Sequence, residues 1–269
     1  MNPHSRPLSF PALEACEPAA PPPEFEQALL DGESTSSNGD LSQAVLTRLS
    51  QFVQLVLAGN RLMNLTALRT SEAVWTGLVL DSLRVAPGLA NLPPGSRVVD
   101  VGCGAGFPGI PLAILFPNLH FTLVDATAKK VAFVSHACQQ LALVNVEPVC
   151  GRAEQLASGS ESRGHCGPLR EHFDLVTARA VAPLPLLLEL TVPFARAPSA
   201  TQQGGRLLLV KGEKADTELS QATRAMQHLS VAHLDTRLTP SSRLLLFQKL
   251  RPTAPRFPRP NGAPKRNPL

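Results

Sequence analysis

The sequence lacks the features by which metal sites, disulfide frameworks and membrane spans are usually recognised. Its five cysteines are scattered and odd in number, with no Cys-x-x-Cys pair and no Cys/His spacing of a zinc site. No run of about 18 apolar residues occurs, so we expect no membrane span. The first residues show no charged-then-apolar signal pattern, and their acidity argues against a transit peptide. We therefore expect a cytoplasmic protein without a metal centre.

Length and charge bound the organisation of the chain. With 269 residues, 43% of them hydrophobic, one domain with extensions is the expected layout. The net charge is +4, yet residues 1–40 hold one Arg and seven acidic residues, whereas residues 251–269 hold five Lys/Arg and no acidic residue. A basic body with a basic tail favours a polyanionic partner. An ordinary solvated surface accounts equally well for much of this modest charge.

Composition and periodicity divide the chain into four parts. They are a disordered acidic and Pro-rich extension (1–40), a helical region (41–96), a core (97–250) and a basic Pro-rich tail (251–269). The extension has few large apolar groups to offset the entropy of ordering it. In the helical region, apolar residues at helical spacing predict helices over about 41–60 and 71–86, the second with Ser71 as its N-cap. We expect this region to pack on one edge of the core sheet.

In the core, short apolar strands alternate with helices, which is typical of a parallel sheet with helices on both faces. The predicted strands cover 97–101, 120–124, 145–149, 173–177, 206–210, 230–237 and 243–250. The predicted helices cover 108–116, 127–142, 153–158, 183–196 and 214–228. The last two strands are close enough to form an antiparallel edge. The predicted fold class is α/β, a doubly wound, mostly parallel seven-stranded sheet with an N-terminal helical extension.

The most informative stretch is Asp100-Val-Gly-Cys-Gly-Ala-Gly106, which ends the first predicted strand. Its glycines, Gly102, Gly104 and Gly106, permit a sharp turn and close approach of a ligand, and the helix start that follows offers unpaired N–H groups. Asp100 would repel a pyrophosphate but attract a cationic group such as the methionine ammonium of S-adenosylmethionine. We therefore favour a methyl-donor site. A dinucleotide site, formally matched by Gly104-x-Gly106-x-x-Gly109, and a purely structural turn are the alternatives.

The other candidate residues follow the strand ends, because ligands of doubly wound sheets bind beyond the carboxyl ends of the strands. Asp125 lies about twenty residues after the turn, where a carboxylate accepts ribose hydroxyls; capping of the next helix is the alternative. Ala153 and Glu154 follow the third strand, where they read an adenine amino group or simply start a helix. Arg179 and Lys211 end the fourth and fifth strands. Two cations facing one cleft suit an anionic substrate, although each could form a surface salt bridge instead.

Five motifs lie along the predicted helical region and core. They are Asn64-Leu-Thr66, Leu80-Asp-Ser82, Asp100-Val-Gly-Cys-Gly-Ala-Gly-Phe-Pro-Gly-Ile-Pro111, Arg179-Ala180 and Lys211-Gly212. Together they resemble the bacterial 16S rRNA guanine-N7 methyltransferase family, also called glucose-inhibited division protein B or RsmG. The extension Phe107-Pro-Gly-Ile-Pro111 is much more specific than the glycines alone. The resemblance runs from about residue 41 to the end of the sequence.

The resemblance implies a class I methyltransferase-like fold and S-adenosylmethionine as the cofactor. It implies that Gly102, Phe107, the Ala153–Glu154 pair and Arg179 bind this cofactor; Asp100, Gly104, Gly106 and Asp125 complete the predicted site. It also implies a guanine of the decoding-region loop of 16S rRNA as the methyl acceptor, in naked RNA or in a small-subunit particle. We take Arg179, Lys211 and Asn64 as substrate-side candidates and expect a monomer. Members commonly carry His where Leu78 stands and Ser where Ala178 stands.

Transfer to guanine N7 needs few side chains. N7 has an in-plane lone pair and carries no proton, so the reaction needs in-line placement of N7, methyl group and sulfur rather than a general base. The sequence has neither the Asn/Asp-Pro-Pro-aromatic motif for exocyclic amines nor a Pro-Cys pair for cytosine C5, and both absences are compatible with this chemistry.

We also have expectations for the basic tail, and three functions remain as alternatives. The basic tail is predicted to contact RNA phosphates through Arg256, Arg259, Lys265 and Arg266, although a merely solubilising end fits its composition as well. The alternatives to an rRNA methyltransferase are a class I methyltransferase for a protein or small molecule, a NAD-dependent oxidoreductase and a non-catalytic RNA-binding protein.

Overall fold

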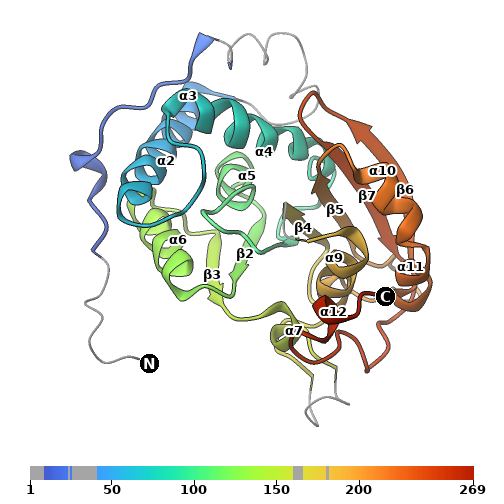
Figure 1. Cartoon of the computed structure of the whole chain (residues 1–269). Coiled ribbons are helices and arrows are strands. Elements are labelled where there is room, and N and C mark those ends of the chain that lie inside the picture. Colours follow the sequence, from blue (N-terminus) through green and yellow to red (C-terminus); the bar gives the residue numbers. More distant parts are fainter. Residues whose placement is uncertain (1–8, 24, 26–40, 160–165, 180–181) are drawn as a thin grey trace, which may run out of the picture.

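A seven-stranded sheet forms the centre of the molecule (Figure 1), with the strand order β3-β2-β1-β4-β5-β7-β6. The molecule is known from a computed structural model, which describes residues 9–23, 25, 41–159, 166–179 and 182–269. The strands are β1 (Arg97–Val101), β2 (His120–Asp125), β3 (Val146–Cys150), β4 (Leu175–Arg179), β5 (Arg206–Lys211), β6 (Val231–Leu238) and β7 (Arg243–Lys249). Each predicted strand is therefore found to within two residues at either end.

Strands β1 to β5 are parallel, whereas β7 runs antiparallel to both β5 and β6. The predicted antiparallel edge and the predicted α/β fold class, a mostly parallel seven-stranded sheet, are confirmed. Neighbouring residues of the central strands are buried on opposite faces: Val98 belongs to one hydrophobic cluster and Val99 to the other. Burial on both faces explains why the strand reads as a continuous apolar run.

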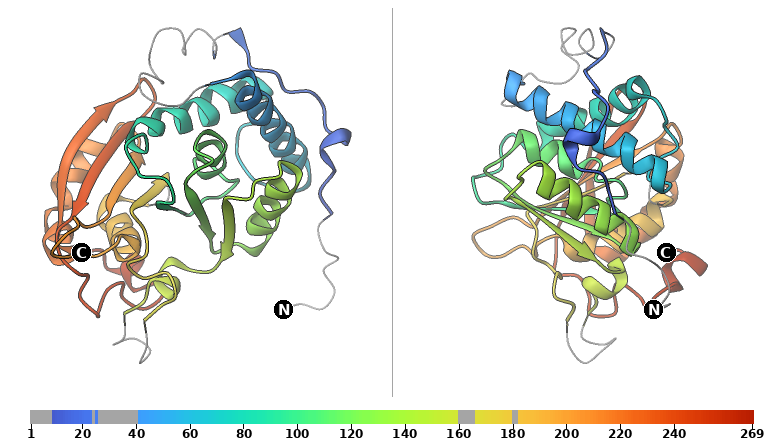
Figure 2. Two further views of the ribbon diagram at one scale, coloured as in Figure 1. Left: turned by 180° about the vertical axis from the view of Figure 1, so that it is seen from behind. Right: turned by 90° about the vertical axis from the view of Figure 1, so that its left-hand side faces the viewer.

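Helices cover both faces of the sheet, as the two further views of Figure 2 show. One face is covered by α2 (Gln43–Leu62), α4 (Leu80–Val85), α5 (Gly109–Leu115) and α6 (Ala128–Gln140). The other is covered by α9 (Leu184–Thr191), α10 (Ala215–Gln221) and α11 (Thr223–Leu229). The predicted helix over 214–228 is thus two helices. No helix in the described part of the chain is long and apolar enough to span a bilayer.

The helical region differs from the sequence prediction in two respects. The segment predicted as one helix over 71–86 consists of α3 (Ser71–Val74), a π-helical turn (Trp75–Val79), α4 and a short 3-10 turn (Ala86–Gly88). Its N-cap is Thr70, whose hydroxyl accepts from the N–H of Ala73, and not Ser71. The region also packs over a face of the sheet rather than on an edge: a Cβ on Gly88 would lie 2.4 Å from Leu208 of β5.

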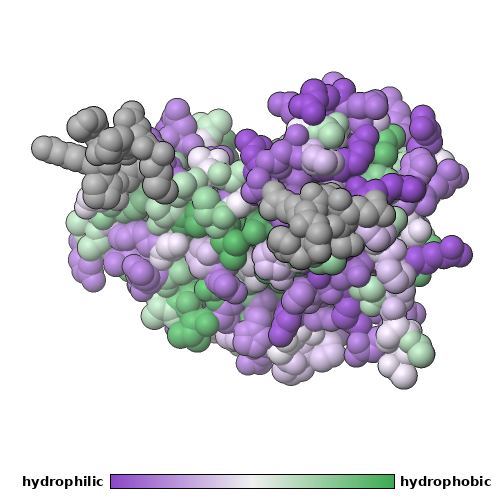
Figure 3. All heavy atoms as spheres, turned by 90° about the horizontal axis from the view of Figure 1, so that it is seen from below, coloured by the Kyte–Doolittle hydropathy of each residue, from purple (hydrophilic) through white to green (hydrophobic). Residues whose placement is uncertain are grey.

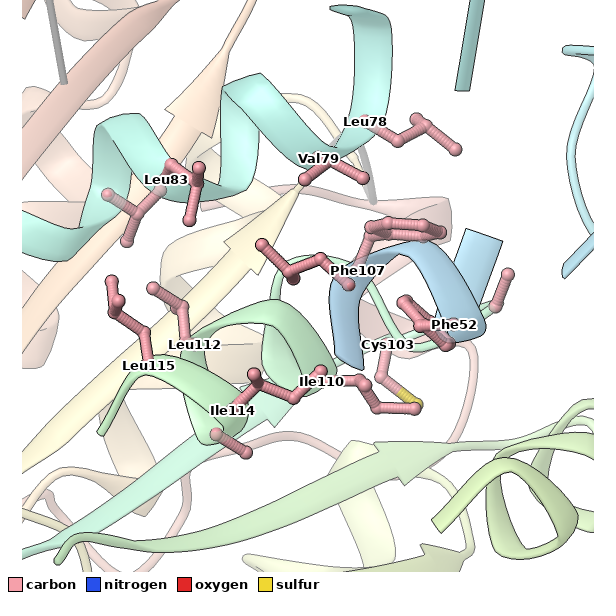
Figure 4. Packing of buried hydrophobic residues seen from close by; sticks show 14 of the residues in the cluster. Phe52, Leu78, Val79, Leu83, Cys103, Phe107, Ile110, Leu112, Ile114 and Leu115 are labelled. Carbon is pink, nitrogen blue, oxygen red and sulfur yellow. The ribbon is translucent and has the colours of Figure 1, made fainter. Parts of the chain in front are cut away.

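Aromatic packing joins the glycine turn to this helical region. Figure 4 shows Phe107, from the turn, beside Phe52 of α2, with Leu78 and Val79 above and Ile110 of α5 close by. The two phenyl rings lie with centroids 4.8 Å apart at 43°. Offset, tilted pairs of this kind stabilise by about 0.5–1.5 kcal/mol beyond their buried area. The turn is therefore fixed from the side opposite the sheet.

Residues 9–23 and 25 contact the body, which differs from the prediction that residues 1–40 are disordered. Phe10 packs edge-on against Phe133 of α6, with ring centroids 5.5 Å apart. The indole N–H of Trp75 donates to the carbonyl of Ala19 at 2.8 Å, and Phe25 packs on the same indole. The same prediction for residues 1–8, 24 and 26–40 lies outside the residues that the structure describes. Long-range contacts that composition does not reveal hold this N-terminal segment.

Residues 251–269, which we call the C-terminal segment, also pack on the body. Phe257 is buried, and the short helix α12 (Ala263–Arg266) lies beside α7 (Ala153–Leu156) and α9 in Figure 1. Arg259 is hydrogen-bonded to the fully buried Glu189 through its backbone N–H and its guanidinium. The prediction that Arg259 contacts RNA phosphates is therefore wrong, because its guanidinium is committed to this carboxylate.

Candidate active site

The glycine turn has the backbone conformation that the sequence predicts. Gly102, Gly104 and Gly106 have φ angles of +77°, +58° and +93°. A residue with a Cβ is strained in this left-handed region, whereas glycine adopts it readily. At Gly106 space is limiting as well, because a Cβ would lie 2.7 Å from the side chain of Ile110. The N–H groups of Gly102 and Cys103 both donate to the carbonyl of Val124, which ties the turn to β2.

The Asp100 carboxylate lies beneath this turn rather than at its rim. It is fully buried, and its Oδ2 accepts the N–H of Gly109, the first residue of α5, at 3.0 Å. Its Oδ1 is buried with no hydrogen-bond partner among the described residues. Burial raises the pKa of Asp100 to about 7, while the Gly109 N–H and the charge of Arg179 oppose this rise. The structure therefore differs from the prediction that Asp100 faces a cationic ligand directly.

Asp125 lies half-buried at the carboxyl end of β2 and is oriented by two backbone N–H groups. Its Oδ2 accepts from Gly104 at 3.0 Å and its Oδ1 accepts from Thr127 at 2.7 Å, just before α6 begins. The N-cap of α6 is Thr127, with no side-chain cap hydrogen bond, so the capping alternative for Asp125 is not confirmed. Each carboxylate oxygen has a further lone pair, and Asp125 lines a cavity on either side. The carboxylate is thus pre-oriented with acceptor capacity left for a ligand.

Two cavities meet at Gly102 and Asp125, at the carboxyl ends of β1 and β2. The larger cavity, of about 610 Å³, lies beyond β2 and β3. It brings together the predicted residues Gly102, Asp125, Ala153 and Glu154. The smaller cavity, of about 320 Å³, lies over the glycine turn and brings together Gly102, Gly104, Phe107, Asp125 and Arg179. Gly106 is absent from both linings; its role is to shape the turn.

Arg179 ends β4, with its largely buried side chain lining the smaller cavity. Its Nη1 donates to the carbonyl of Gly77 at 3.3 Å, and its guanidinium carbon lies 5.8 Å from the ring centroid of Phe107. Gly77 belongs to the π-helical turn, a local irregularity that is frequent at functional sites. Burial lowers the pKa of Arg179, and the charges of Asp81 and Asp100 oppose that lowering. The side chain is held, yet it still borders the cavity.

Two predicted substrate-side residues do not line either cavity. The Nζ of Lys211 lies 2.8 Å from Oε2 of Glu218 and donates to the carbonyl of Ala182 at 2.6 Å. Lys211 is buried by these contacts, so the prediction that it faces the cleft is wrong. The side chain of Asn64 is exposed and accepts from Arg69 at 2.9 Å. The next two residues along the chain, 65 and 66, line the smaller cavity in its place.

Sequence reasoning missed several residues at the two cavities. The buried Asn60 accepts from the backbone N–H groups of Leu65 and Thr66, which places that loop against the smaller cavity. Lys130 of α6 lines the same cavity. The available signal for Asn60 was its spacing, four residues after Val56 and seven after Val53, which places it on the buried face of α2. The residues of the C-terminal segment that line the larger cavity are Gly262, Lys265 and Pro268.

The chain was compared with known protein families. The model of the GidB family, described as rRNA small subunit methyltransferase G, matches residues 45–245, which include the glycine turn and every strand except the last residues of β7. The chain belongs to this family. Ribosomal RNA small subunit methyltransferase G of Sorangium cellulosum is 40% identical over 237 residues, covering 88% of this chain and 91% of that protein.

A second relative agrees with this assignment, and one solved structure is similar in fold. The protein of the same name from Synechococcus sp. (strain JA-3-3Ab) is 36% identical over 269 aligned positions, covering 95% of this chain and 97% of that protein. A mutant of MtNAS aligns with a TM-score of 0.50 and 14% identity, over 84% of this chain and 81% of that one. The latter likeness concerns the fold alone.

The two departures from the family pattern lie in different surroundings. Leu78, where members of the GidB family commonly carry His, lines the smaller cavity. Ala178, where they commonly carry Ser, is fully buried in β4 among the hydrophobic residues beneath α9. Only Leu78 can therefore alter what the smaller cavity contacts. Among the described residues, no group of three His, Cys, Asp or Glu is placed to hold a metal ion.

Proposed function

We propose that this GidB-family protein transfers a methyl group from S-adenosylmethionine to N7 of a guanine in 16S rRNA. The observation that carries the proposal is the junction of the two cavities at Gly102 and Asp125. One ligand lying across that junction has its nucleoside end in the larger cavity and its reactive end in the smaller one. The acceptor base then enters from the side of the smaller cavity.

The larger cavity fits the nucleoside end of the cofactor. Its volume is within the range of small-molecule sites, roughly 300–1,000 Å³. Asp125 offers carboxylate oxygens to the ribose hydroxyls, and Glu154 stands beyond β3, where it can accept from the adenine amino group. The positive φ angles of the glycines allow the backbone to approach the ligand closely. When bound, the cofactor supplies a methyl group activated by the sulfonium.

The smaller cavity fits the amino-acid end. Arg179 is the only Arg on its described lining and suits the cofactor carboxylate, because the guanidinium fork binds such a group with charge-assisted hydrogen bonds. The carbonyl of Gly77 and the ring of Phe107 hold the guanidinium in advance. A pre-oriented side chain loses less entropy when the ligand binds. Lys130, on the same lining, offers a cation to an RNA phosphate.

The chemistry available at the smaller cavity favours N7 over an acceptor that must lose a proton. No His or Glu stands on its described lining. Burial raises the pKa of the Cys103 thiol well above its ordinary value, so the thiolate nucleophile is disfavoured. Asp125 is already hydrogen-bonded to two backbone N–H groups. Because N7 carries no proton, positioning by this lining is sufficient for the transfer.

The proposal is tested by mapping 7-methylguanosine in 16S rRNA from cells with and without this gene. We expect one site in the decoding-region loop to lose its methyl group when the gene is removed. An unchanged map would contradict the assignment to this RNA. Methylation by the purified protein of naked 16S rRNA and of small-subunit particles then identifies the form that it modifies. A thermal shift with S-adenosylhomocysteine but not NADH separates the proposal from an oxidoreductase.

A further inference from the structure

We propose that the C-terminal segment forms a wall of the larger cavity and binds the nucleoside end of the cofactor, rather than RNA. The inference rests on the proposed function. Three residues of the segment, Gly262, Lys265 and Pro268, line the larger cavity together with Asp125 and Glu154. The cavity is therefore closed on one side by a part of the chain more than a hundred residues beyond β3.

Arg170 fixes the start of the segment. Its guanidinium donates to the carbonyls of Thr253, Ala254 and Phe257 at 2.6 Å, 3.3 Å and 2.6 Å, and to that of Ala157 at 3.0 Å. The chains approach closely here, since a Cβ on Gly159 would lie 1.8 Å from a carbonyl oxygen of the segment. Hydrogen bonds to a charged group stabilise by about 1.5–3 kcal/mol each. The segment is thus tied to the loop that follows α7.

A buried ion pair fixes the middle of the segment to α9, a helix that also lines the larger cavity. Glu189 of α9 is fully buried and accepts from the Nε and the backbone N–H of Arg259 at 2.8 Å and 2.9 Å. The same helix places Leu186 and Leu190 on the lining of the larger cavity. The anchor of the segment and the apolar wall of the cavity are therefore parts of one helix.

Beyond this anchor the segment turns back over the cavity. Gly262, with a φ of +77°, starts α12, and its N–H donates to Oε1 of Glu154 at 3.4 Å. Glu154 is the residue proposed to accept from the adenine amino group, so the segment directly contacts a residue of the proposed nucleoside site. Figure 3 views the molecule from the side on which α7 and α12 lie in Figure 1, and this face is largely hydrophilic.

The position of Lys265 favours cofactor binding over phosphate binding. Lys265 is exposed and yet lines the cavity, as expected of a lysine whose stem covers an apolar surface while its ammonium stays in water. Arg266, the next residue, is also exposed but is absent from the lining. The two residues therefore form a matched pair, with the same charge on the same short helix and only one at the cavity.

The test measures binding of S-adenosylhomocysteine by calorimetry and the melting temperature without ligand. We expect Lys265→Ala to weaken binding a few-fold and Arg266→Ala to leave it unchanged, because both remove one positive charge but only one uncovers the cavity. Removal of residues 262–269 keeps the Arg170 and Arg259 anchors and is expected to weaken binding about tenfold or more. Equal effects of the two alanine variants, or wild-type affinity in the shortened chain, would overturn the proposal.

A second measurement separates this inference from the proposed function. The wild-type protein is titrated with S-adenosylhomocysteine first; absence of binding there refutes the cofactor and hence both proposals. Binding of a 16S rRNA fragment is then measured at several salt concentrations for the same variants. We expect the RNA affinity and its salt dependence to change little on removal of residues 262–269. Loss of RNA affinity with unchanged cofactor affinity overturns the cavity-wall proposal alone.

Discussion

Asp100 and Asp125 end neighbouring strands, yet their surroundings give the two carboxylates different properties. Asp100 is fully buried under the turn, and its pKa is raised to about 7. Asp125 borders both cavities and is oriented by two N–H groups. A ligand therefore meets Asp125, while Asp100 supports the start of α5 through Gly109. Of the two acids that the sequence marks as ligands, only the second is placed to act as one.

The raised pKa of Asp100 makes stability depend on pH. Between pH 4 and 7 the unfolded chain has lost the Asp100 proton while the folded protein keeps it, so the free energy of unfolding falls as pH rises and levels off above pH 7. The change from this one group is at most about 4 kcal/mol. The Asp100→Asn variant lacks this titrating group but keeps an oxygen that accepts the N–H of Gly109. Urea unfolding should show that the variant is more stable relative to the wild type at pH 7.5 than at pH 5. A difference in the free energy of unfolding that is the same at both pH values would contradict this.

Arg179 is expected to matter for the reaction more than for folding. Among the described residues, its side chain makes one hydrogen bond, the 3.3 Å contact with Gly77, so Arg179→Ala should change the melting temperature by only a few degrees. Loss of a charge-assisted contact of about 1.5–3 kcal/mol predicts a 10- to 100-fold fall in kcat/KM for methyl transfer. Arg179→Lys keeps the positive charge but not the planar guanidinium, so its kcat/KM should lie between those of the wild type and the alanine variant. A wild-type rate for the alanine variant would remove Arg179 from the site.

At the scale of elements, the glycine turn contains glycines needed for different reasons. A Cβ on Gly109 would lie 2.2 Å from Leu123 of β2, whereas one on Gly104 would meet no atom closer than 4.0 Å. Gly109→Ala should therefore destabilise by about 1–3 kcal/mol or more through overpacking. Gly104→Ala meets only the strain of a φ of +58°, about 1 kcal/mol, but faces the smaller cavity. We expect Gly109→Ala to have the lower melting temperature and Gly104→Ala to have the lower affinity for S-adenosylhomocysteine. If the same variant were lower in both measurements, this division of roles would be wrong.

The elements that the sequence predicts well are those whose signals are local. The strands and the glycine turn follow from runs of apolar residues and from glycine spacing, and all lie within two residues of their predicted bounds. Strand-end position alone does not reveal the partner of a side chain. Lys211 and Arg179 occupy equivalent positions, but Glu218 neutralises the first, while the second stays at a cavity. The charged partner was in the sequence, yet only the fold brings it to Lys211.

At the scale of the whole molecule, both terminal segments are part of the packed structure. The partners of their key contacts are far away in sequence: Arg259 binds Glu189 over 70 residues, and Trp75 binds Ala19 over 56. Composition does not reveal these distant partners, so its richness in Pro and lack of large apolar residues predicted a disordered N-terminal extension. A few buried anchors per segment are enough to order it.

The Arg259–Glu189 pair is expected to stabilise the fold. Arg259→Ala leaves a fully buried carboxylate without its cation, which costs about 3–5 kcal/mol. Arg61→Ala is the control: Arg61 pairs with Glu17 at the surface, with 67% and 76% of the side chains exposed, and should cost less than about 1 kcal/mol. Urea unfolding of the two variants measures the difference. Equal losses would mean that the Arg259–Glu189 pair contributes no more to stability than a surface pair does.

The N-terminal segment can be followed through the single tryptophan of the chain. Trp75 is fully buried, donates to Ala19 and has the ring of Phe25 at 4.7 Å. Phe25→Ala should destabilise by about 3 kcal/mol and shift the tryptophan emission to longer wavelength, because water gains access to the indole. Phe10→Ala removes a comparable contact, against Phe133, and should leave the emission unchanged. If neither variant alters the emission, residues 9–23 and 25 do not cover Trp75 in solution, and the prediction of a disordered extension holds for them.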